Sequence, residues 1–332
     1  MKRNIKVLDI FYGNKCNLAC SQCDTRSDHI RKGKGLLDPE IEEIKESIYY
    51  AHQKFNVNIW SVLGGEPLLY IAKVEEILKY LRSLDPTATV FFPTNGSLLD
   101  KHMDKVVELT KTYNLSVQVC NHFVEFSDIS YSNKVIKNTE ELARRLELTV
   151  ESTSQDWWEK VIDMKSGGQE WIDHMNARGF TPDVLDEEDR AWIGDGYGVY
   201  YIESPYFKTI TKFDSKGQPK PFDSPDPKAS YWNSCPSDFC ALLRNKKIYK
   251  CGALGTLETF LKRYNALDDP AWQKYLNYKP LDLETCSDED IDNYMKTIYC
   301  HIDECSMCPM NNIEVRKVEK EVLPKLKVVN IT

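Results

Sequence analysis

Short apolar runs alternate with amphipathic segments along the chain from residue 5 to about residue 150. Unbroken apolar runs of this length are typical of buried strands, whereas apolar residues spaced three and four apart are typical of helices. Strands are predicted at 5–13, 58–67, 88–96, 115–123 and 148–152, and helices at 39–55, 71–84, 101–114 and 138–147. Because strands and helices alternate, the pattern predicts βα units whose parallel sheet closes wholly or partly into a barrel.

The alternation weakens beyond the last of these strands. The segment 154–196 is aromatic and acidic with little periodicity, and 198–204 predicts one further strand. The expected fold class is therefore α/β, a partial (β/α)6 TIM-like barrel. Residues 213–230 are rich in Pro, Asp, Ser and Gly, which is typical of a connector. We expect a barrel domain over 1–212 and a smaller cysteine-rich domain over 213–332.

Polar and glycine-rich motifs stand where the predicted strands end. Cys16 follows the first strand, Gly64-Gly65-Glu66 the second, Thr94-Asn95-Gly96 the third, and Asn121 the fourth. In a parallel barrel the carboxyl ends of the strands meet at one rim, where functional groups collect. The sequence therefore predicts that these motifs, up to about 100 positions apart, face the same site.

Charge and composition limit which binding partners and which cellular compartment are expected for the protein. The formal net charge is −8 and the pI about 5.4, so the overall field repels polyanions and makes bare nucleic acid an unfavourable partner. No secretion signal and no long apolar run is present, so we expect a cytoplasmic protein without a membrane partner. Eleven cysteines in such a chain favour metal binding over disulfides.

Three cysteines lie close together near the start of the chain. Cys16, Cys20 and Cys23 have the spacing CxxxCxxC on a loop directly after the first predicted strand. Iron–sulfur clusters of the [4Fe–4S] type are normally held by four thiolates, so three would leave one iron open to a small molecule. Structural zinc needs a closed set of four ligands, for which His29 is the nearest further candidate.

This trio, followed by GGEP after the second strand and TNG after the third, resembles the radical S-adenosylmethionine (radical SAM) superfamily. The resemblance implies that S-adenosylmethionine chelates the open iron and is reductively cleaved to a 5′-deoxyadenosyl radical, which abstracts a hydrogen atom from substrate. It also implies an electron donor of flavodoxin or ferredoxin type. The chain departs from the family at Gln22, where an aromatic residue is usual.

The resemblance also implies roles for residues at the rim. The backbone of Gly64 and Gly65, together with Glu66, would receive the α-ammonium of S-adenosylmethionine, and glycines allow such close approach of the main chain. Further cofactor contacts are expected from Thr94, Asn95, Gln118 and Asn121, the last two at the ribose hydroxyls. Solvation of a strand end is the alternative for Gln118 and Asn121.

Seven of the eleven cysteines lie in the tail from residue 231. The segment LLRNKKIYKC predicts a hairpin that ends in a thiol, although Lys246 stands where the related pattern has glycine. The tail resembles an auxiliary-cluster domain of SPASM or twitch type, and a zinc ribbon is the alternative because thiolate spacing alone does not separate the metals. The expected ligands of a second [4Fe–4S] cluster are Cys251, Cys305 and Cys308 with either Cys235 or Cys240.

Several features are left without a functional role. Cys120 and Cys286 are interpreted as incidental thiols, and the role of Cys300 is open. The substrate pocket is expected to use aromatic residues of 154–208, with Trp157, Trp171, Tyr197 and Tyr206 as candidates. No catalytic residue is assigned.

The predicted function is that of a radical SAM enzyme acting on a small molecule, a nucleotide or sugar derivative, or a peptide. Only 15 residues precede Cys16, so recognition of a peptide would need another surface or a separate partner. The alternative is a non-catalytic binding module stabilised by zinc.

Overall fold

The computed structural model describes residues 2–20, 23–27, 38–122, 129–152, 190–193, 197–203, 211–235 and 240–310. Trp157, Trp171 and Tyr206, three of the four aromatic pocket candidates, lie outside these residues, as do His29 and Gln22. In the described part of the chain, no helix combines the length and apolar character needed to cross a membrane.

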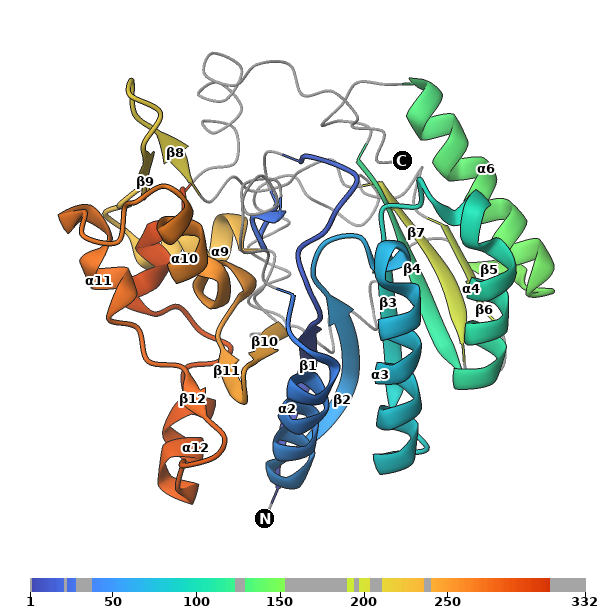
Figure 1. The fold of residues 1–332 in the computed structure, drawn as a ribbon, viewed down its shortest axis with the longest axis horizontal. Coiled ribbons are helices and arrows are strands. Elements are labelled where there is room, and N and C mark those ends of the chain that lie inside the picture. The colour runs from blue at the N-terminus through green and yellow to red at the C-terminus, as the bar shows by residue number, and fades with distance from the viewer. Residues whose placement is uncertain are drawn as a thin grey trace.

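One large sheet organises the molecule (Figure 1). Its strand order is β12-β11-β10-β1-β2-β3-β4-β7-β6-β5, and β8 pairs separately with β9. The strands are β1 Arg3–Phe11, β2 Phe55–Leu63, β3 Thr89–Thr94, β4 Leu115–Asn121, β5 Thr149–Ser152, β6 Arg190–Ile193, β7 Gly198–Glu203, β8 Lys212–Phe213, β9 Pro219–Lys220, β10 Cys240–Arg244, β11 Lys247–Tyr249 and β12 Leu281–Asp282. The helices and 3₁₀ turns are α2 Ile41–Lys54, η1 Pro67–Tyr70, α3 Ile71–Leu84, α4 Leu99–Tyr113, α6 Ile129–Arg145, α9 Pro227–Ser234, α10 Gly252–Arg263, η3 Pro270–Trp272, α11 Gln273–Leu276, α12 Asp288–Met295 and η4 Asp303–Met307.

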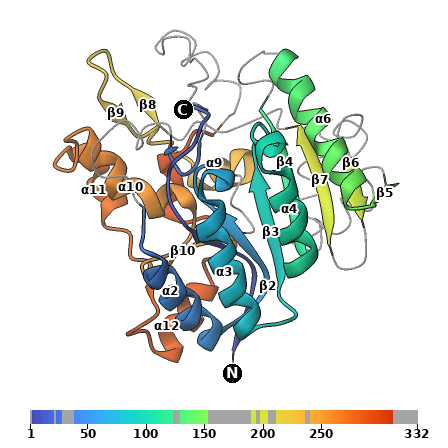
Figure 2. The ribbon, with the colours of Figure 1, turned by 45° about the vertical axis from the view of Figure 1, so that its right-hand side comes forward.

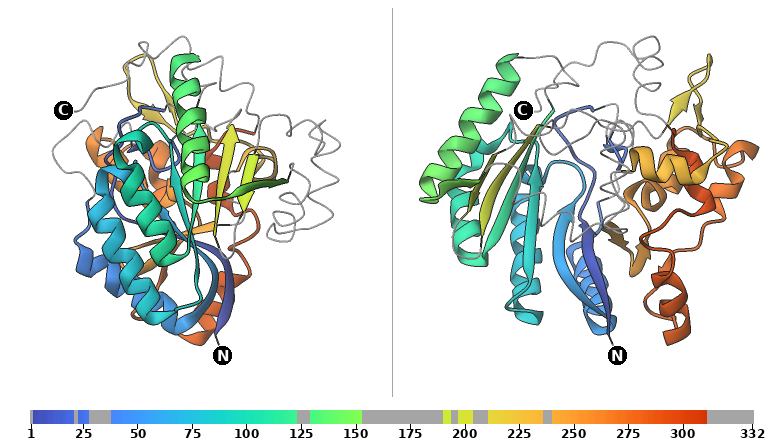
Figure 3. Two further views of the ribbon diagram at one scale, coloured as in Figure 1. Left: turned by 90° about the vertical axis from the view of Figure 1, so that its right-hand side faces the viewer. Right: turned by 180° about the vertical axis from the view of Figure 1, so that it is seen from behind.

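The predicted α/β barrel-like architecture is confirmed. Six described strands, β10, β1, β2, β3, β4 and β7, lie side by side and parallel. Helices α2, α3, α4 and α6 cover one face of this sheet (Figure 2), and Figure 3 shows the sheet from behind, with these helices on its far side. The carboxyl ends of the parallel strands therefore share one rim.

The helices follow from the apolar spacing in the sequence. In α3 the buried residues are Val74, Ile77, Leu78 and Leu81, which form a single stripe against the sheet. Helix α2 begins with a capping box, in which the backbone N–H of Glu40 donates to the Glu43 carboxylate at 3.1 Å. Only α6 differs clearly from expectation, because it begins at Ile129, nine residues before the predicted start at 138.

Two strands take different places from those that the alternation predicted. Strand β5 pairs antiparallel with β6 at the edge of the sheet, so it is not a parallel barrel strand. The place beside β4 is taken by β7, and the sixth parallel strand is β10, which comes from the tail and pairs with β1. Hydrophobic periodicity predicts that a strand exists, but the order of strands depends on which chain segment can occupy each open edge.

The tail contributes β10 to the main sheet and also has a hydrophobic core of its own. Buried residues of α10 and of the segments that follow it pack together: Ala253, Leu254, Leu257, Phe260, Leu261, Ala266, Trp272, Tyr275 and Met307. Other tail residues, among them Leu281 and Ile291, join the main core instead. The division of the chain between residues 212 and 213 stays a prediction.

Lys246, which stands where the related pattern has glycine, lies in the turn of the β10–β11 hairpin. Asn245 and Lys246 both have positive φ, at +51° and +56°, as in a type I′ turn, for which Asn-Gly is the preferred pair. The Lys246 backbone N–H donates to Ser47 Oγ at 2.9 Å, and its ammonium lies 2.9 Å from the Glu284 carboxylate. The chain therefore holds a residue with a side chain where glycine fits better.

Replacing this lysine should separate the backbone strain from the ion pair. We expect Lys246→Gly to unfold with a free energy about 1 kcal/mol higher than Lys246→Ala, because both variants lose the ion pair and only alanine keeps the left-handed strain. Urea titrations of the two variants measure the difference. Equal stability of the two variants would contradict the strain at this turn.

Candidate functional site: the cysteine loop and the glycine turn

The three N-terminal cysteines lie on a loop that leaves β1 at the rim of the sheet. Cys16, Cys20 and Cys23 are all partly exposed. Backbone hydrogen bonds from Cys23 N to Cys20 O at 3.3 Å and from Arg26 N to Cys23 O at 2.9 Å turn the chain back after the third cysteine. The loop thus presents its thiols on one short, tightly turned segment.

The glycine turn after β2 docks directly on this loop. The Gly65 N–H donates to Gly13 O at 2.9 Å, and the Glu66 N–H donates to Lys15 O at 2.7 Å. A Cβ on Gly65 would stand 1.8 Å from Lys15 O, and a Cβ on Gly64 would stand 2.3 Å from Gly13 O. Both glycines are therefore required for the two segments to meet, and the predicted proximity of trio and turn is observed.

Glu66 joins the second strand to the third. Its buried carboxylate accepts hydrogen bonds from Thr94 Oγ1 at 2.6 Å, Asn95 N at 2.9 Å and Leu68 N at 3.2 Å. Burial raises the pKa of the Glu66 carboxyl to about 7, although these hydrogen bonds act in the opposite direction. In this structure Glu66 holds the rim together, while its role toward an ammonium group stays a prediction.

The raised pKa of Glu66 predicts a pH-dependent stability. The folded protein binds the Glu66 proton more tightly than the unfolded chain, whose carboxyl has a pKa near 4.5, so stability falls as pH rises toward about 7 and beyond it levels off. From about pH 6 to about pH 8, the free energy of unfolding should fall by about 1 kcal/mol more in the wild type than in Glu66→Gln, which has no titrating carboxyl. Unfolding titrations at several pH values measure this, with the α3 variant Glu76→Gln as control. Parallel pH profiles for wild type and Glu66→Gln would contradict the assignment.

An amide network connects the cysteine loop to the third strand. Asn95 Nδ2 donates to Asn17 Oδ1 at 3.0 Å, and Asn17 Nδ2 donates to Ser97 Oγ at 2.7 Å. The Asn95 amide also lies 4.0 Å from Cys16 Sγ, within the range of a weak N–H···S contact. Thr94 and Asn95 therefore lie at the site as predicted, but their contacts run to Glu66 and to the loop.

Thr25 makes the corresponding connection at the other end of the loop. Its hydroxyl lies 3.2 Å from Cys23 Sγ, 2.9 Å from Ser27 Oγ and 3.1 Å from Gly64 O. Thr25 and Asn17 were missed by sequence reasoning because nothing in their spacing marks them. Both stand within three residues of a predicted ligand, and that was the available signal.

One further polar residue at the loop was also missed. Asn14 is fully buried two residues before Cys16, and neither atom of its amide has a hydrogen-bond partner among the described residues. A buried amide normally has partners, so this group is available to a ligand at the site. With the three thiols and the glycine turn, it shows that the residues present fit a thiolate-bound cluster and a small chelating cofactor.

The polar residues of the fourth strand make internal contacts. Asn121 Nδ2 donates to Ser132 Oγ at 2.8 Å and to Tyr201 Oη at 2.7 Å. Gln118 Nε2 lies 3.7 Å from Cys120 Sγ. Contacts of either residue with ribose hydroxyls stay a prediction.

The tail thiols divide into two environments. Desolvation raises the pKa of the Cys251 thiol, and so do the neighbouring Cys235, Cys308 and Cys305, so these three cysteines lie near Cys251. Cys305 and Cys308 are brought together by a 3₁₀ turn in which Cys308 N donates to Cys305 O at 3.1 Å. The donor set is all sulfur, which fits an iron–sulfur cluster or zinc.

Cys240 makes a different contact. Its thiol and the Ser61 hydroxyl hydrogen-bond to the Asp9 carboxylate on β1, and burial raises the pKa of Asp9 to about 7. Cys300 donates its thiol proton to Lys296 O at 3.0 Å. Cys235 is a neighbour of both Cys251 and Cys240, and the choice between Cys235 and Cys240 as the fourth ligand stays a prediction.

Among the described residues, no three His, Cys, Asp or Glu side chains are grouped closely enough to hold a single metal ion. A [4Fe–4S] cluster instead takes its thiolates on different irons.

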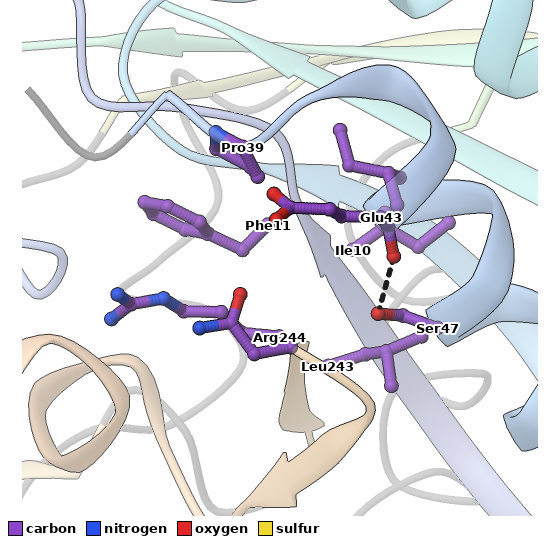
Figure 4. Close-up of a pocket in the computed structure, with 9 residues that line it drawn as sticks. Ile10, Phe11, Pro39, Glu43, Ser47, Leu243 and Arg244 are labelled. Carbon is purple, nitrogen blue, oxygen red and sulfur yellow. Dashed lines mark hydrogen bonds between the residues drawn. The ribbon is translucent and has the colours of Figure 1, made fainter.

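A pocket elsewhere in the molecule is separate from both cysteine sites. It lies between β1, α2 and β10 and is lined by Ile10, Phe11, Pro39, Glu43, Ile44, Ser47, Leu243, Arg244 and Asn245 (Figure 4). Inside it, Ser47 Oγ donates to Glu43 O at 2.8 Å. No residue predicted to bind a cluster or cofactor lines this pocket.

Known proteins resemble part of the chain. The family model described as the Radical SAM superfamily matches residues 10–175, which is half of the chain. A 7-carboxy-7-deazaguanine synthase of Methanothermobacter thermautotrophicus is 32% identical over 109 residues, covering 32% of this chain and 40% of that protein. A GTP 3′,8-cyclase of Clostridium perfringens is 30% identical over 147 residues, covering 42% of this chain and 43% of that protein.

A solved structure overlaps a similar share of the chain. Polyhistidine-tagged anSMEcpe with bound AdoMet aligns with a TM-score of 0.33 and 18% sequence identity, covering 43% of this chain and 40% of that one. The chain thus spans about two fifths of the length of each of these three proteins.

Proposed function

This chain belongs to the radical SAM superfamily, and we propose on that premise that it cleaves S-adenosylmethionine reductively to start hydrogen-atom abstraction from a substrate. Members of the superfamily are enzymes that use a [4Fe–4S] cluster and S-adenosylmethionine. The observation that carries the proposal is the docking of the Gly64-Gly65-Glu66 turn on the loop of Cys16, Cys20 and Cys23.

In this proposal, some residues of the rim bind the cluster and others hold the binding segments in position. Cys16, Cys20 and Cys23 would hold the cluster, which supplies, together with S-adenosylmethionine, a 5′-deoxyadenosyl radical. The glycines leave the backbone open to close approach by a ligand. Glu66 fixes Thr94 and the Asn95 backbone, so the third strand keeps its place beside the loop.

A second [4Fe–4S] cluster is proposed in the tail. Its ligands would be Cys251 and the three cysteines near it, Cys235, Cys305 and Cys308. Cys240 is left out because its thiol is engaged by the buried Asp9. The tail would then be an auxiliary domain of SPASM or twitch type, beginning after residue 212.

The substrate class and the electron donor are also proposals. The curated relatives include proteins named for GTP and for a deazaguanine product, so purine nucleotides are the first substrates to test, ahead of sugar derivatives and peptides. The electron donor would be a flavodoxin or ferredoxin.

Anaerobic reconstitution tests the proposal directly. Protein supplied with iron and sulfide, then with dithionite and S-adenosylmethionine, should release 5′-deoxyadenosine, which chromatography detects. Adding the correct substrate should increase the amount released. Colourless protein that retains zinc and yields no 5′-deoxyadenosine would instead support the zinc-stabilised binding module.

A further inference from the structure

Arg26 lies in the interior, three residues beyond Cys23. Only 1% of its surface is exposed. Its backbone φ is +52°, in the left-handed region that disfavours residues with a side chain. Desolvation of the charge and the left-handed backbone each raise the free energy of the folded state. Contacts of the Arg26 side chain with its surroundings must therefore offset both.

One side of the guanidinium contacts the helix that follows Cys251. Nη1 donates to the Ala253 carbonyl and to Thr256 Oγ1, the latter at 3.3 Å. The guanidinium carbon also lies 4.8 Å from the ring centre of Phe260, in a cation–π arrangement. Arg26 is therefore fixed against the start of α10, directly beside a proposed cluster ligand.

The remaining nitrogens reach other segments. Nη2 lies 3.7 Å from Met307 Sδ, next to Cys308, and Nε donates to Thr211 Oγ1 at 3.4 Å. The backbone N–H of Arg26 donates a hydrogen bond to the carbonyl of Cys23. This single side chain thus connects the N-terminal cysteine loop to two of the tail segments that carry proposed ligands.

Thiol groups and one carboxylate, that of Asp24, surround the Arg26 guanidinium. Arg26 is almost fully buried, and the Asp24 carboxylate interacts with it electrostatically. Burial lowers the pKa of Arg26 to about 10, and the nearby Cys308, Cys251, Cys23 and Asp24 act in the opposite direction. The guanidinium therefore stays charged at neutral pH, and the groups placed to balance it are the Asp24 carboxylate and, where they bind a cluster, the cysteine thiolates.

We propose that Arg26 is an electrostatic positioning residue for the tail cluster, whose guanidinium stabilises the reduced, more negative state. This inference rests on the proposed auxiliary cluster. Reduction adds negative charge to a thiolate-bound cluster, and a fixed cation in a desolvated site favours that charge. Removing the cation should therefore make the cluster harder to reduce.

The test compares two substitutions that separate charge from hydrogen bonding. Arg26→Lys keeps the positive charge but loses the planar fork, whereas Arg26→Gln keeps amide donors but loses the charge. Both are made in a Cys20→Ala background, so that the tail cluster gives the only iron–sulfur signal. Potentiometric titrations followed by electron paramagnetic resonance measure the midpoint potential, and iron analysis measures occupancy.

For Arg26→Gln, we expect a midpoint potential at least about 59 mV more negative than that of the parent. At the parent's midpoint potential, this shift lowers the ratio of reduced to oxidised cluster at least tenfold for a one-electron couple. Arg26→Lys should stay within about threefold of the parent ratio, a shift of less than about 30 mV. The matched control is Arg244→Gln, because Arg244 also contacts α10, through the Gly255 carbonyl, and lies over the Phe11 ring. Its midpoint should equal that of the parent.

Each further outcome decides between the two proposals. Iron loss in Arg26→Gln but not in Arg26→Lys would also support a charge requirement. Equal iron loss in both variants, or an unchanged midpoint in iron-replete Arg26→Gln, would overturn the role of Arg26 and leave the auxiliary cluster standing. A Cys20→Ala parent that binds no iron would overturn the auxiliary cluster itself, and the inference with it.

Discussion

Cys20→Ala should reduce the formation of 5′-deoxyadenosine to the level of the protein-free reaction. The middle cysteine of the loop is one of only three proposed thiolates for the SAM-binding cluster, and two thiolates do not fix its position. The iron of the tail site should remain, because its proposed ligands lie on other segments. Product chromatography and iron analysis of the reconstituted variant measure both effects.

The matched control is a cysteine that belongs to neither set. Cys286 lies near β12, where its backbone N–H donates to Asp282 O at 2.9 Å. Cys286→Ala should retain product formation and the full iron content. If Cys20→Ala still released 5′-deoxyadenosine at the wild-type rate, the assignment of the loop as the SAM-binding site would be wrong.

Gly65→Ala should strongly destabilise the protein or prevent uptake of the first cluster, through a steric clash alone. The new Cβ would lie 1.8 Å from Lys15 O and 2.4 Å from Lys15 C, and a main-chain carbonyl cannot rotate away as a side chain can. The turn and the cysteine loop must therefore separate. We expect a loss of at least about 3 kcal/mol in unfolding free energy, or failure to take up the first cluster. Urea titration and iron analysis test this.

A second glycine gives a control with ordinary surroundings. Gly252 begins α10, and a Cβ there would meet nothing closer than Asp24 Oδ2 at 3.4 Å. Gly252→Ala should change stability by less than about 1 kcal/mol, since alanine is also favoured in a helix. Full iron content and unchanged stability in Gly65→Ala would show that the loop does not need its close contact with the turn.

The pH effect at Glu66 and the potential shift at Arg26 share one physical origin. Both side chains are ionisable groups withdrawn from water, and in each case desolvation is the largest influence on the pKa. The difference lies in their partners. Glu66 accepts three hydrogen bonds, whereas Arg26 donates its own to carbonyl, hydroxyl and thioether groups.

Local patterns in the sequence were enough to predict the elements and the family. The stripe in α3 and the apolar-rich segment of β1 follow from side-chain spacing, which depends on neighbouring residues only. The same is true of the CxxxCxxC loop and of the glycine turn, whose motifs are contiguous. The family was therefore identifiable before any contact between distant segments was known.

The sequence predicted that the rim motifs meet, but only the tertiary structure decided which strands pair at the edges and which polar side chains are buried. It placed β10 beside β1 and β5 at the edge, and it buried Arg26 against α10. Edge pairing, desolvation and charge balance depend on packing between residues far apart in the chain. Hydrophobic periodicity and motif spacing carry no information about that packing.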